Sequence, residues 1–190
     1  MLEIKKHLNE ITTISDYDWD FFVARLQHRV IKKKEVFLKS GEVENYISFI
    51  ESGAVRLFIP KDDSEKEITF GFSLKNEFIS AYESFLTRKP STYQLQALTD
   101  TTLVSITYDD MQEVYKNTKI GNFIGRLTAE RLFLTKSNRV QHLLNLNAEE
   151  RYLKLFKERP KLLKVIPLKY ISSYIGITAQ ALSRIRKRIS

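Results

Sequence analysis

The stretch Leu168-Lys-Tyr-Ile-Ser-Ser-Tyr-Ile-Gly-Ile-Thr-Ala-Gln-Ala-Leu-Ser-Arg-Ile-Arg-Lys187 has the pattern of two short helices joined by a tight turn. Ile171 and Ile175 fall on one side of a first helix, and an apolar repeat that starts at Leu182 marks a second. Gly176 stands between the two repeats, where a tight turn needs the positive φ that glycine adopts readily. This pattern predicts a helix-turn-helix, whose second helix sits in the major groove of DNA.

The second helix is expected to have one buried face and one polar face. At 100° per residue, the buried face holds Thr178, Leu182, Ile185 and Ile189. The side chains turned outward are those of Gln180, Ser183, Arg184 and Lys187. Gln pairs with adenine and Arg with guanine through two hydrogen bonds each, while Ser and Lys suit phosphate or base contacts. Thr178 is also placed to cap the helix and bring its amide groups toward a phosphate.

The charge of the chain is concentrated in the same region. Residues 148–190 hold 11 Lys/Arg and 3 Asp/Glu, whereas residues 1–147 hold 20 of each, so the last 43 residues carry the whole net charge of +8. Such asymmetry predicts a polyanionic partner, with DNA, RNA and an anionic membrane as candidates. The alternative is that this segment is an ordinary amphipathic helical hairpin whose basic tail is solvated and binds no partner. DNA is favoured because the turn pattern and the charge are independent and coincide.

A long helix is predicted over residues 120–146, where the only glycines are Gly121 and Gly125 near the start. It is expected either to pair two copies of the chain or to pack on its own domain. We favour pairing, because a small barrel cannot cover a helix of about 39 Å. The residues expected at the dimer interface are Ile120, Phe123, Ile124, Leu127 and Leu134. Polar interruptions argue against a strict coiled coil.

The N-terminal part has the pattern of a β barrel that follows a helix over Asp16–Gln27. Short β-branched and aromatic runs separated by polar turns predict a sandwich or jelly-roll. The runs are Val30–Ile31, Val36–Leu38, Tyr46–Ile50, Val55–Ile59, Ile68–Phe72, Tyr93–Leu98 and Leu103–Ile106. Shorter helices are predicted at Met111–Lys116 and Ala148–Lys157, the second ended by Arg159-Pro160.

Composition excludes several classes of function. The chain has no cysteine, so it forms no disulfide, thiolate zinc site or cysteine-held iron–sulfur cluster. The histidines His7, His28 and His142 are scattered, and no metal site or cofactor is predicted. No nucleophile–base spacing or P-loop appears, so we do not expect an enzyme. Without a membrane-length apolar run or a signal peptide, a cytoplasmic protein with no membrane partner is expected.

These features resemble the Crp/Fnr family of transcription regulators along nearly the whole chain. Lys169 to Arg188 is similar to the helix-turn-helix of that family, in which Gln180 and Arg184 match base-reading positions and Ala179 stands where many members carry another polar residue. Ser52 to Leu57 resembles a barrel turn, and Asn76 to Ile79 the start of the phosphate-binding cassette. The resemblance implies a barrel of the cyclic-nucleotide-binding type, a helix that pairs two chains, and RNA polymerase as a further candidate partner.

The cassette departs from the members that bind cyclic AMP. Those members place a Glu on the ribose and an Arg on the cyclic phosphate, whereas Ser91 stands at the arginine position here and Arg88 lies three residues earlier. A buried phosphate without a cation is costly, so cyclic AMP is not the expected effector. By resemblance, the effector pocket would be lined by Glu77, Phe78, Tyr82, Glu83, Ser84, Ser91 and Thr92.

The sequence therefore predicts an α+β protein with three parts. Residues 1–118 form a jelly-roll sensor domain, 119–146 the dimerisation helix, and 147–190 a (winged) helix-turn-helix that contacts double-stranded DNA through Lys169, Thr178, Ala179, Gln180, Ser183, Arg184 and Lys187. A sequence-specific transcription regulator is the predicted function. The alternative is a signalling module of the same barrel type that acts through protein partners, and RNA binding ranks third because its aromatic–basic signatures are missing.

Overall fold

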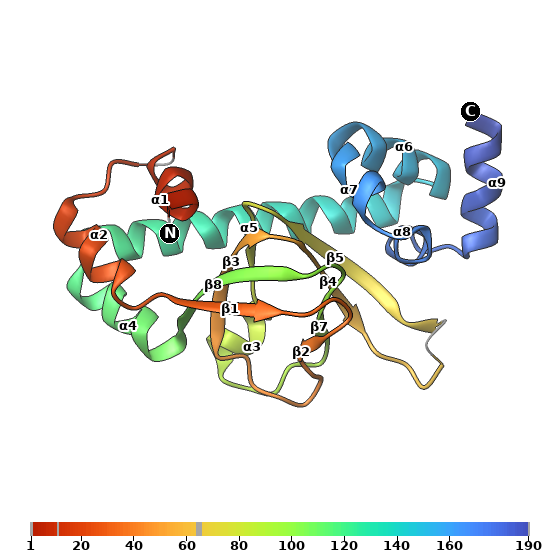
Figure 1. Ribbon diagram of the computed structural model, residues 1–190. Coiled ribbons are helices and arrows are strands. Elements are labelled where there is room, and N and C mark those ends of the chain that lie inside the picture. The colour runs from red at the N-terminus through yellow and green to blue at the C-terminus, as the bar shows by residue number, and fades with distance from the viewer. Residues whose placement is uncertain (1, 11, 64–65, 190) are drawn as a thin grey trace.

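The computed structural model of the protein describes residues 2–10, 12–63 and 66–189. A barrel lies at its centre, and one long helix runs past the barrel and links two groups of helices (Figure 1). The strands of the barrel are β1 (Gln27–Ile31), β2 (Val36–Leu38), β3 (Tyr46–Ser52), β4 (Ala54–Ile59), β5 (Ile68–Leu74), β6 (Phe78–Ile79), β7 (Gln94–Ala97) and β8 (Thr101–Thr107).

These strands form two antiparallel sheets of four strands each within the described residues, in the orders β1-β8-β3-β6 and β2-β7-β4-β5. Alternate side chains point between the sheets, where Ile50, Val55, Leu95 and Leu103 are buried. The predicted β-rich barrel is therefore confirmed. The sequence analysis missed β6, which has only two residues and pairs with Ser48 and Phe49 of β3.

Gly53 forms the tight connection between β3 and β4. Its φ is +105°, and a Cβ atom at this position would lie 2.3 Å from Oγ1 of Thr101 and 2.8 Å from the carbonyl oxygen of Asp100. Both the backbone conformation and the close approach of β8 therefore require glycine here.

The helices before and after the barrel gather at one end of the molecule (Figure 1). They are α1 (Leu2–Asn9), α2 (Asp16–Val23) and α4 (Tyr108–Asn117), while the short α3 (Tyr82–Thr87) lies between β6 and β7. The prediction that the second helix extends to Gln27 is wrong. Residues 27–31 pair instead with Thr101–Ser105 of β8, and this ladder ends the helix early because it satisfies the same backbone groups.

The long helix α5 (Lys119–Asn145) confirms the prediction over residues 120–146. Thr118 caps its start by accepting a hydrogen bond from the N–H of Gly121. The N-terminal part of α5 packs against the barrel and the helices beside it. Ile120 is buried there, and Ile124 contacts the cluster around Phe49. Farther along the helix, apolar side chains are exposed at Phe133, Leu134, Val140, Leu143 and Leu144.

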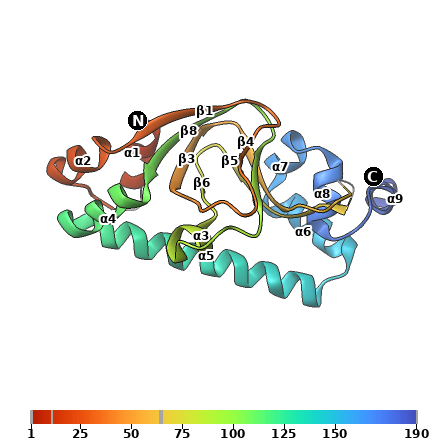
Figure 2. The same cartoon turned by 90° about the horizontal axis from the view of Figure 1, so that it is seen from below.

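Four helices follow α5 at the other end of the molecule (Figure 2). They are α6 (Ala148–Glu158), α7 (Pro160–Val165), α8 (Leu168–Ile175) and α9 (Ala179–Ile189). Pro160 ends α6 as predicted but also begins α7, which was not predicted, because proline fits the first helical position where no N–H bond is needed. The described residues after Thr107 contain no strand, so they provide none for a wing.

Candidate nucleic-acid interface and barrel pocket

Helices α8 and α9 pack across a small apolar core. Ile171, Ile175 and Leu182 are almost fully buried, and Ile185 is buried beside them. Gly176 ends α8 with φ +86° and ψ +35°, and its N–H donates to the carbonyl oxygens of Ser172 and Ser173. The helical repeats and the glycine turn predicted from the sequence are therefore present, and they set the angle at which α9 leaves α8.

Thr178 caps the start of α9. Its hydroxyl accepts a hydrogen bond from the N–H of Ala181, 3.2 Å away. The N–H groups in the first turn of a helix carry partial positive charge, so the start of α9 is suited to bind an anion.

The outer face of α9 is exposed to solvent. It carries the predicted contact residues Ala179, Gln180, Ser183, Arg184 and Lys187. Within the described part of the chain, Arg184 and Lys187 have no ion-pair partner. Arg188 pairs with Glu149 of α6, and Ile189, expected on the buried face, is 39% exposed. The face therefore offers two free cations and two hydrogen-bonding side chains on one helix.

Lys169 lies apart from this face, in the first turn of α8. It is exposed, and its Nζ lies 4.8 Å from the centroid of the Tyr170 ring. The predicted residues therefore form one contiguous group on α9, with Lys169 on the preceding helix.

Two arginines that the sequence analysis missed bind the C-terminal end of α8. Arg139 of α5 donates to the carbonyl oxygen of Tyr174, and Nε of Arg151 on α6 donates to that of Ile175 over 2.9 Å. The last carbonyls of a helix lack partners within it, and cations there also oppose the helix dipole favourably. No local sequence signal marks this contact, because Arg139 and Tyr174 are 35 positions apart.

The residues predicted to line an effector pocket lie in two places, and five of them lie on α3 or in the loop after it. Ser84 lies on α3, and its hydroxyl donates to the carbonyl oxygen of Lys89 and accepts from the N–H of Glu44. Ser91 is buried, and its hydroxyl donates to the carbonyl oxygen of Tyr93 over 2.8 Å. Glu83 and Thr92 are exposed. The two serines thus hold the loop around α3 together.

Glu77 and Phe78 lie away from this loop. Glu77 forms an ion pair with Arg159, in which one terminal nitrogen of Arg159 lies 2.7 and 2.9 Å from the two carboxylate oxygens of Glu77. Phe78 packs edge-on against Phe49, with ring centroids 5.3 Å apart. Phe78 and Tyr82 line a largely apolar cavity of about 40 Å³ bounded by α1, α4, α5 and the barrel. Of the seven predicted pocket residues, Phe78 and Tyr82 thus share this cavity, whereas Ser84 and Ser91 bond within the loop around α3. One effector site formed by all seven stays a prediction.

A buried acid that was not predicted occupies the centre of the loop region. The Glu44 carboxylate accepts hydrogen bonds from the N–H groups of Tyr46 at 2.9 Å and Ala81 at 3.2 Å. Burial raises the pKa of Glu44, and these N–H groups and the charge of Arg29 partly oppose the rise. Burial, with the charges of Glu83 and Glu44, also raises the pKa of Tyr93 to about 12.

Arg88 lies close to Glu44, and its guanidinium is bound to other groups of the protein. Its guanidinium donates to the carbonyl oxygen of Glu44 at 2.7 Å and to Oδ1 of Asn45 at 2.9 Å, and it lies 4.2 Å from the Tyr108 ring centroid. These contacts fix its guanidinium on the protein itself. The region therefore presents a buried carboxylate and two engaged serines where an anionic ligand would need a cation.

The chain is similar to known proteins in both its sequence and its fold. Residues 28–118 match the family model described as the cyclic nucleotide-binding domain. The barrel is therefore similar to a cyclic nucleotide-binding domain. None of the curated proteins matches the sequence. The name of the domain describes its fold, and the ligand depends on the residues that line it.

The solved structures similar to the chain cover the barrel and the helices on both sides. FixK2 from Bradyrhizobium japonicum is 17% identical with a TM-score of 0.72, over 86% of this chain and 84% of that one. The c-di-GMP responsive regulator CLP from Xanthomonas campestris is also 17% identical, with a TM-score of 0.68 over 92% and 91%. A protein assigned to the crp/fnr family of transcriptional regulators from Eubacterium rectale is 16% identical, with a TM-score of 0.68 over 92% and 83%. The chain has the fold of Crp/Fnr regulators.

The described part of the chain holds no helix long and apolar enough to cross a membrane. It also holds no cluster of three or more His, Asp or Glu side chains able to bind a metal ion.

Proposed function

We propose that this protein is a Crp/Fnr-family transcription regulator, that it binds double-stranded DNA in the cytoplasm, and that it is not an enzyme. The observation that carries the proposal is the exposed face of α9, where Arg184 and Lys187 are unpaired among the described residues and Gln180 lies beside them. A helix that presents these groups on a rigid support is suited to the major groove. The concentration of positive charge in residues 148–190 supports the same partner.

Each contact residue has a role in the proposal. Arg184 lies near the middle of the exposed face and is assigned to guanine, and Gln180 to adenine. Ala179 and Ser183 approach the base edges, while Lys187, Lys169 and the capped start of α9 at Thr178 bind phosphates.

The protein is proposed to act as a homodimer through α5. Of the residues expected at the interface, Ile120 is already buried and Ile124 packs within the subunit, whereas Leu134 is 59% exposed. Phe123 and Leu127 are half-buried. The apolar surface that remains lies farther along the helix, so we place the centre of the interface near Leu134 and Leu144. Contact with RNA polymerase is carried into the proposal by the family resemblance alone.

The barrel is proposed to sense something other than cyclic AMP. Arg88 is bound to the backbone carbonyl of Glu44 and to Asn45, and Ser91 stands where a phosphate-binding arginine is expected, so neither position offers a free cation to a cyclic phosphate. The alternative proposal is a signalling module that acts through protein partners. This alternative assigns no role to the unpaired cations of α9, Arg184 and Lys187.

Selection of bound fragments from a random pool of duplex DNA tests the function. We expect the purified protein to recover a two-fold symmetric element and to retard it in a gel more strongly than scrambled duplex. The affinity should fall steeply with salt concentration, because binding releases counterions from the phosphates. Recovery of unrelated sequences, with equal retardation of specific and scrambled duplex, would favour the protein-partner alternative.

A further inference from the structure

The barrel and the C-terminal helices share one apolar core. Phe72 of β5 is buried in the same cluster as Ile171 of α8, and Ala54 and Leu98 of the barrel belong to it too. The rings of Phe72 and Tyr174 are 5.3 Å apart between centroids. The helices are therefore packed directly on the barrel as well as joined to it through α5.

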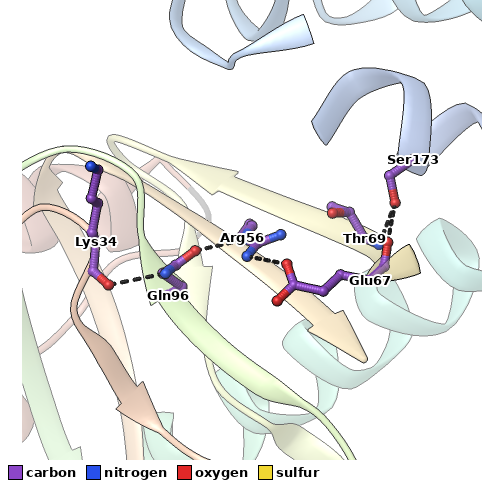
Figure 3. A network of polar contacts seen from close by, with 6 residues as sticks. All are labelled: Lys34, Arg56, Glu67, Thr69, Gln96 and Ser173. Atoms are coloured by element: carbon purple, nitrogen blue, oxygen red, sulfur yellow. Dashed lines mark hydrogen bonds and ion pairs between the residues drawn. The ribbon is translucent and has the colours of Figure 1, made fainter. Parts of the chain in front are cut away.

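Ser173 attaches α8 to the edge of a sheet. β5 is the last strand in the order β2-β7-β4-β5, so one side of its backbone pairs with no other strand of the described chain. The Ser173 hydroxyl accepts from the N–H of Thr69 at 2.9 Å and donates to the carbonyl oxygen of Glu67 at 2.7 Å (Figure 3). One side chain of α8 thus takes the place of a neighbouring strand at two backbone groups.

Arg56 connects this point to the far side of the sheet. Its Nε donates to Oε1 of Gln96 and one terminal nitrogen to the Glu67 carboxylate, each over 2.7 Å, while Gln96 reaches the carbonyl oxygen of Lys34 (Figure 3). The buried guanidinium also lies 4.0 Å from the centroid of the Tyr170 ring on α8. A continuous polar chain therefore runs from the connection between β1 and β2 to α8.

A second attachment lies at the junction of α6 and α7. Arg159 binds both carboxylate oxygens of Glu77 and also donates to the carbonyl oxygen of Phe72 at 3.3 Å. One terminal nitrogen of the guanidinium binds the carboxylate and the other binds the Phe72 carbonyl, so the contact fixes the orientation of Arg159 as well as its distance. We call the contacts of Ser173, Tyr170 and Arg159 with the barrel the docking contact.

The docking contact adds polar restraints to helices that are otherwise held by the chain connection from α5, by the Arg139 contact with Tyr174 and by the shared apolar core. Along the chain, the C-terminal helices continue from α5 only through Leu146 and Asn147. Dimeric helix-turn-helix proteins read two half-sites about 34 Å apart, so a small rotation of this unit changes the spacing that fits. With α8 fixed on β5, the position of α9 relative to α5, and so to a second copy, is also fixed.

We infer that the docking contact determines the half-site spacing that the protein accepts on DNA, with Ser173 and Arg159 as positioning residues. The inference rests on the proposed function and extends it from the bases read to the geometry of the operator. The exposed face of α9 is not part of the docking contact, so reading of each half-site is independent of it.

A matched pair of double variants of the full chain tests the inference. The docking variant combines Ser173→Ala with Arg159→Ala. The control combines Ser172→Ala, which removes only a bond to the carbonyl oxygen of Lys169, with Lys154→Ala, whose partner is the exposed Glu158. Each variant loses one hydroxyl and one positive charge from the same region. Both are taken with the wild type through selection from a random pool of duplex DNA, and the recovered fragments are sequenced.

We expect the wild type and the control to recover one half-site sequence at one dominant spacing. The docking variant should recover the same half-site, but the share of fragments at the dominant spacing should fall by at least roughly fivefold, because a single net hydrogen bond already corresponds to about that factor and the variant removes several. An unchanged spacing distribution would overturn the inference. Loss of the half-site itself would also overturn it, because docking would then support the recognition helix rather than its placement. If the wild type recovered no element, the proposed function would fail instead.

Discussion

The guanidinium of Arg139 on α5 donates a hydrogen bond to the carbonyl oxygen of Tyr174 at the end of α8 and lies 3.6 Å from the centroid of the Tyr174 ring. The proposed dimerisation helix therefore touches the proposed DNA-binding unit directly, two residues before the turn between α8 and α9 begins at Gly176. Burial lowers the pKa of Arg139, and the contact with Tyr174 opposes this shift.

Replacing Arg139 by Ala should destabilise the protein by about 1–3 kcal/mol, because a helix-end carbonyl loses its charged partner in a half-buried site. Urea unfolding gives the change in free energy, and hydrogen exchange should show faster opening of α8. Arg126→Ala is the control, since Arg126 forms an exposed pair with Glu130 on the same helix and such pairs contribute about 0–1 kcal/mol. Equal effects of the two substitutions would count against a structural role for the Arg139 contact.

Arg184→Ala should weaken binding to the selected DNA element by about 1–3 kcal/mol, with a smaller loss on random DNA, because a two-bond base contact is removed. Lys187→Ala and Lys169→Ala should instead weaken both kinds of DNA evenly and flatten the salt dependence, as phosphate contacts do. Binding isotherms on specific and scrambled duplexes at several salt concentrations distinguish the two patterns. If Arg184→Ala reduced both affinities equally, Arg184 would be a phosphate contact.

Leu134→Glu should raise the dissociation constant of the dimer at least about tenfold, because each subunit would lose a buried leucine worth roughly 1.5–3 kcal/mol and gain a charge in the interface. Light scattering across a concentration series measures the mass. Thr135→Glu adds the same charge at the next exposed position, about 100° round the helix, and should have less effect. A wild-type chain that stays monomeric at micromolar concentration with DNA present would refute the dimer proposal.

Glu44 should make stability depend on pH. Because burial raises its pKa above the usual 4.5, the folded state binds this proton more tightly than the unfolded state. Its contribution to stability is therefore complete below about pH 4.5 and is lost as the pH rises through the folded-state pKa. Glu44→Gln removes the titration. As the pH rises from about 4.5 through the folded-state pKa, the free energy of unfolding of the variant should therefore increase relative to that of the wild type. Parallel curves in urea titrations at successive pH values would argue against it.

Cyclic AMP should not bind with submicromolar affinity. The Arg88 guanidinium is already bound to the backbone carbonyl of Glu44 and to Oδ1 of Asn45, so it is not free to pair with a cyclic phosphate. Calorimetric titration with cyclic AMP and cyclic GMP measures this directly. Submicromolar binding of either nucleotide would show that the loop around α3 rearranges to free the arginine.

Local patterns in the sequence determined most of the elements of this fold. Short β-branched and aromatic runs predicted the strands of the barrel other than β6, and helical spacing predicted α5, α8 and α9, because each signal lies within a few consecutive residues. Gly176 marked the turn for the same reason, since its positive φ is a property of one residue. Charge counting located the basic C-terminal region without any structure.

Contacts between distant residues were decided only by the tertiary structure. Ser173 and Glu67 are 106 positions apart, and neither differs in its local sequence from an ordinary surface residue. Pairing with β8 ended α2 early, and burial beneath α3 gave Glu44 its role, since both depend on which strand or loop lies alongside. The sequence by itself determined the helices and the barrel of this protein. Only tertiary packing decided that α8 is fixed to β5 at the edge of the sheet, because an edge strand finds its partner in space and not along the chain.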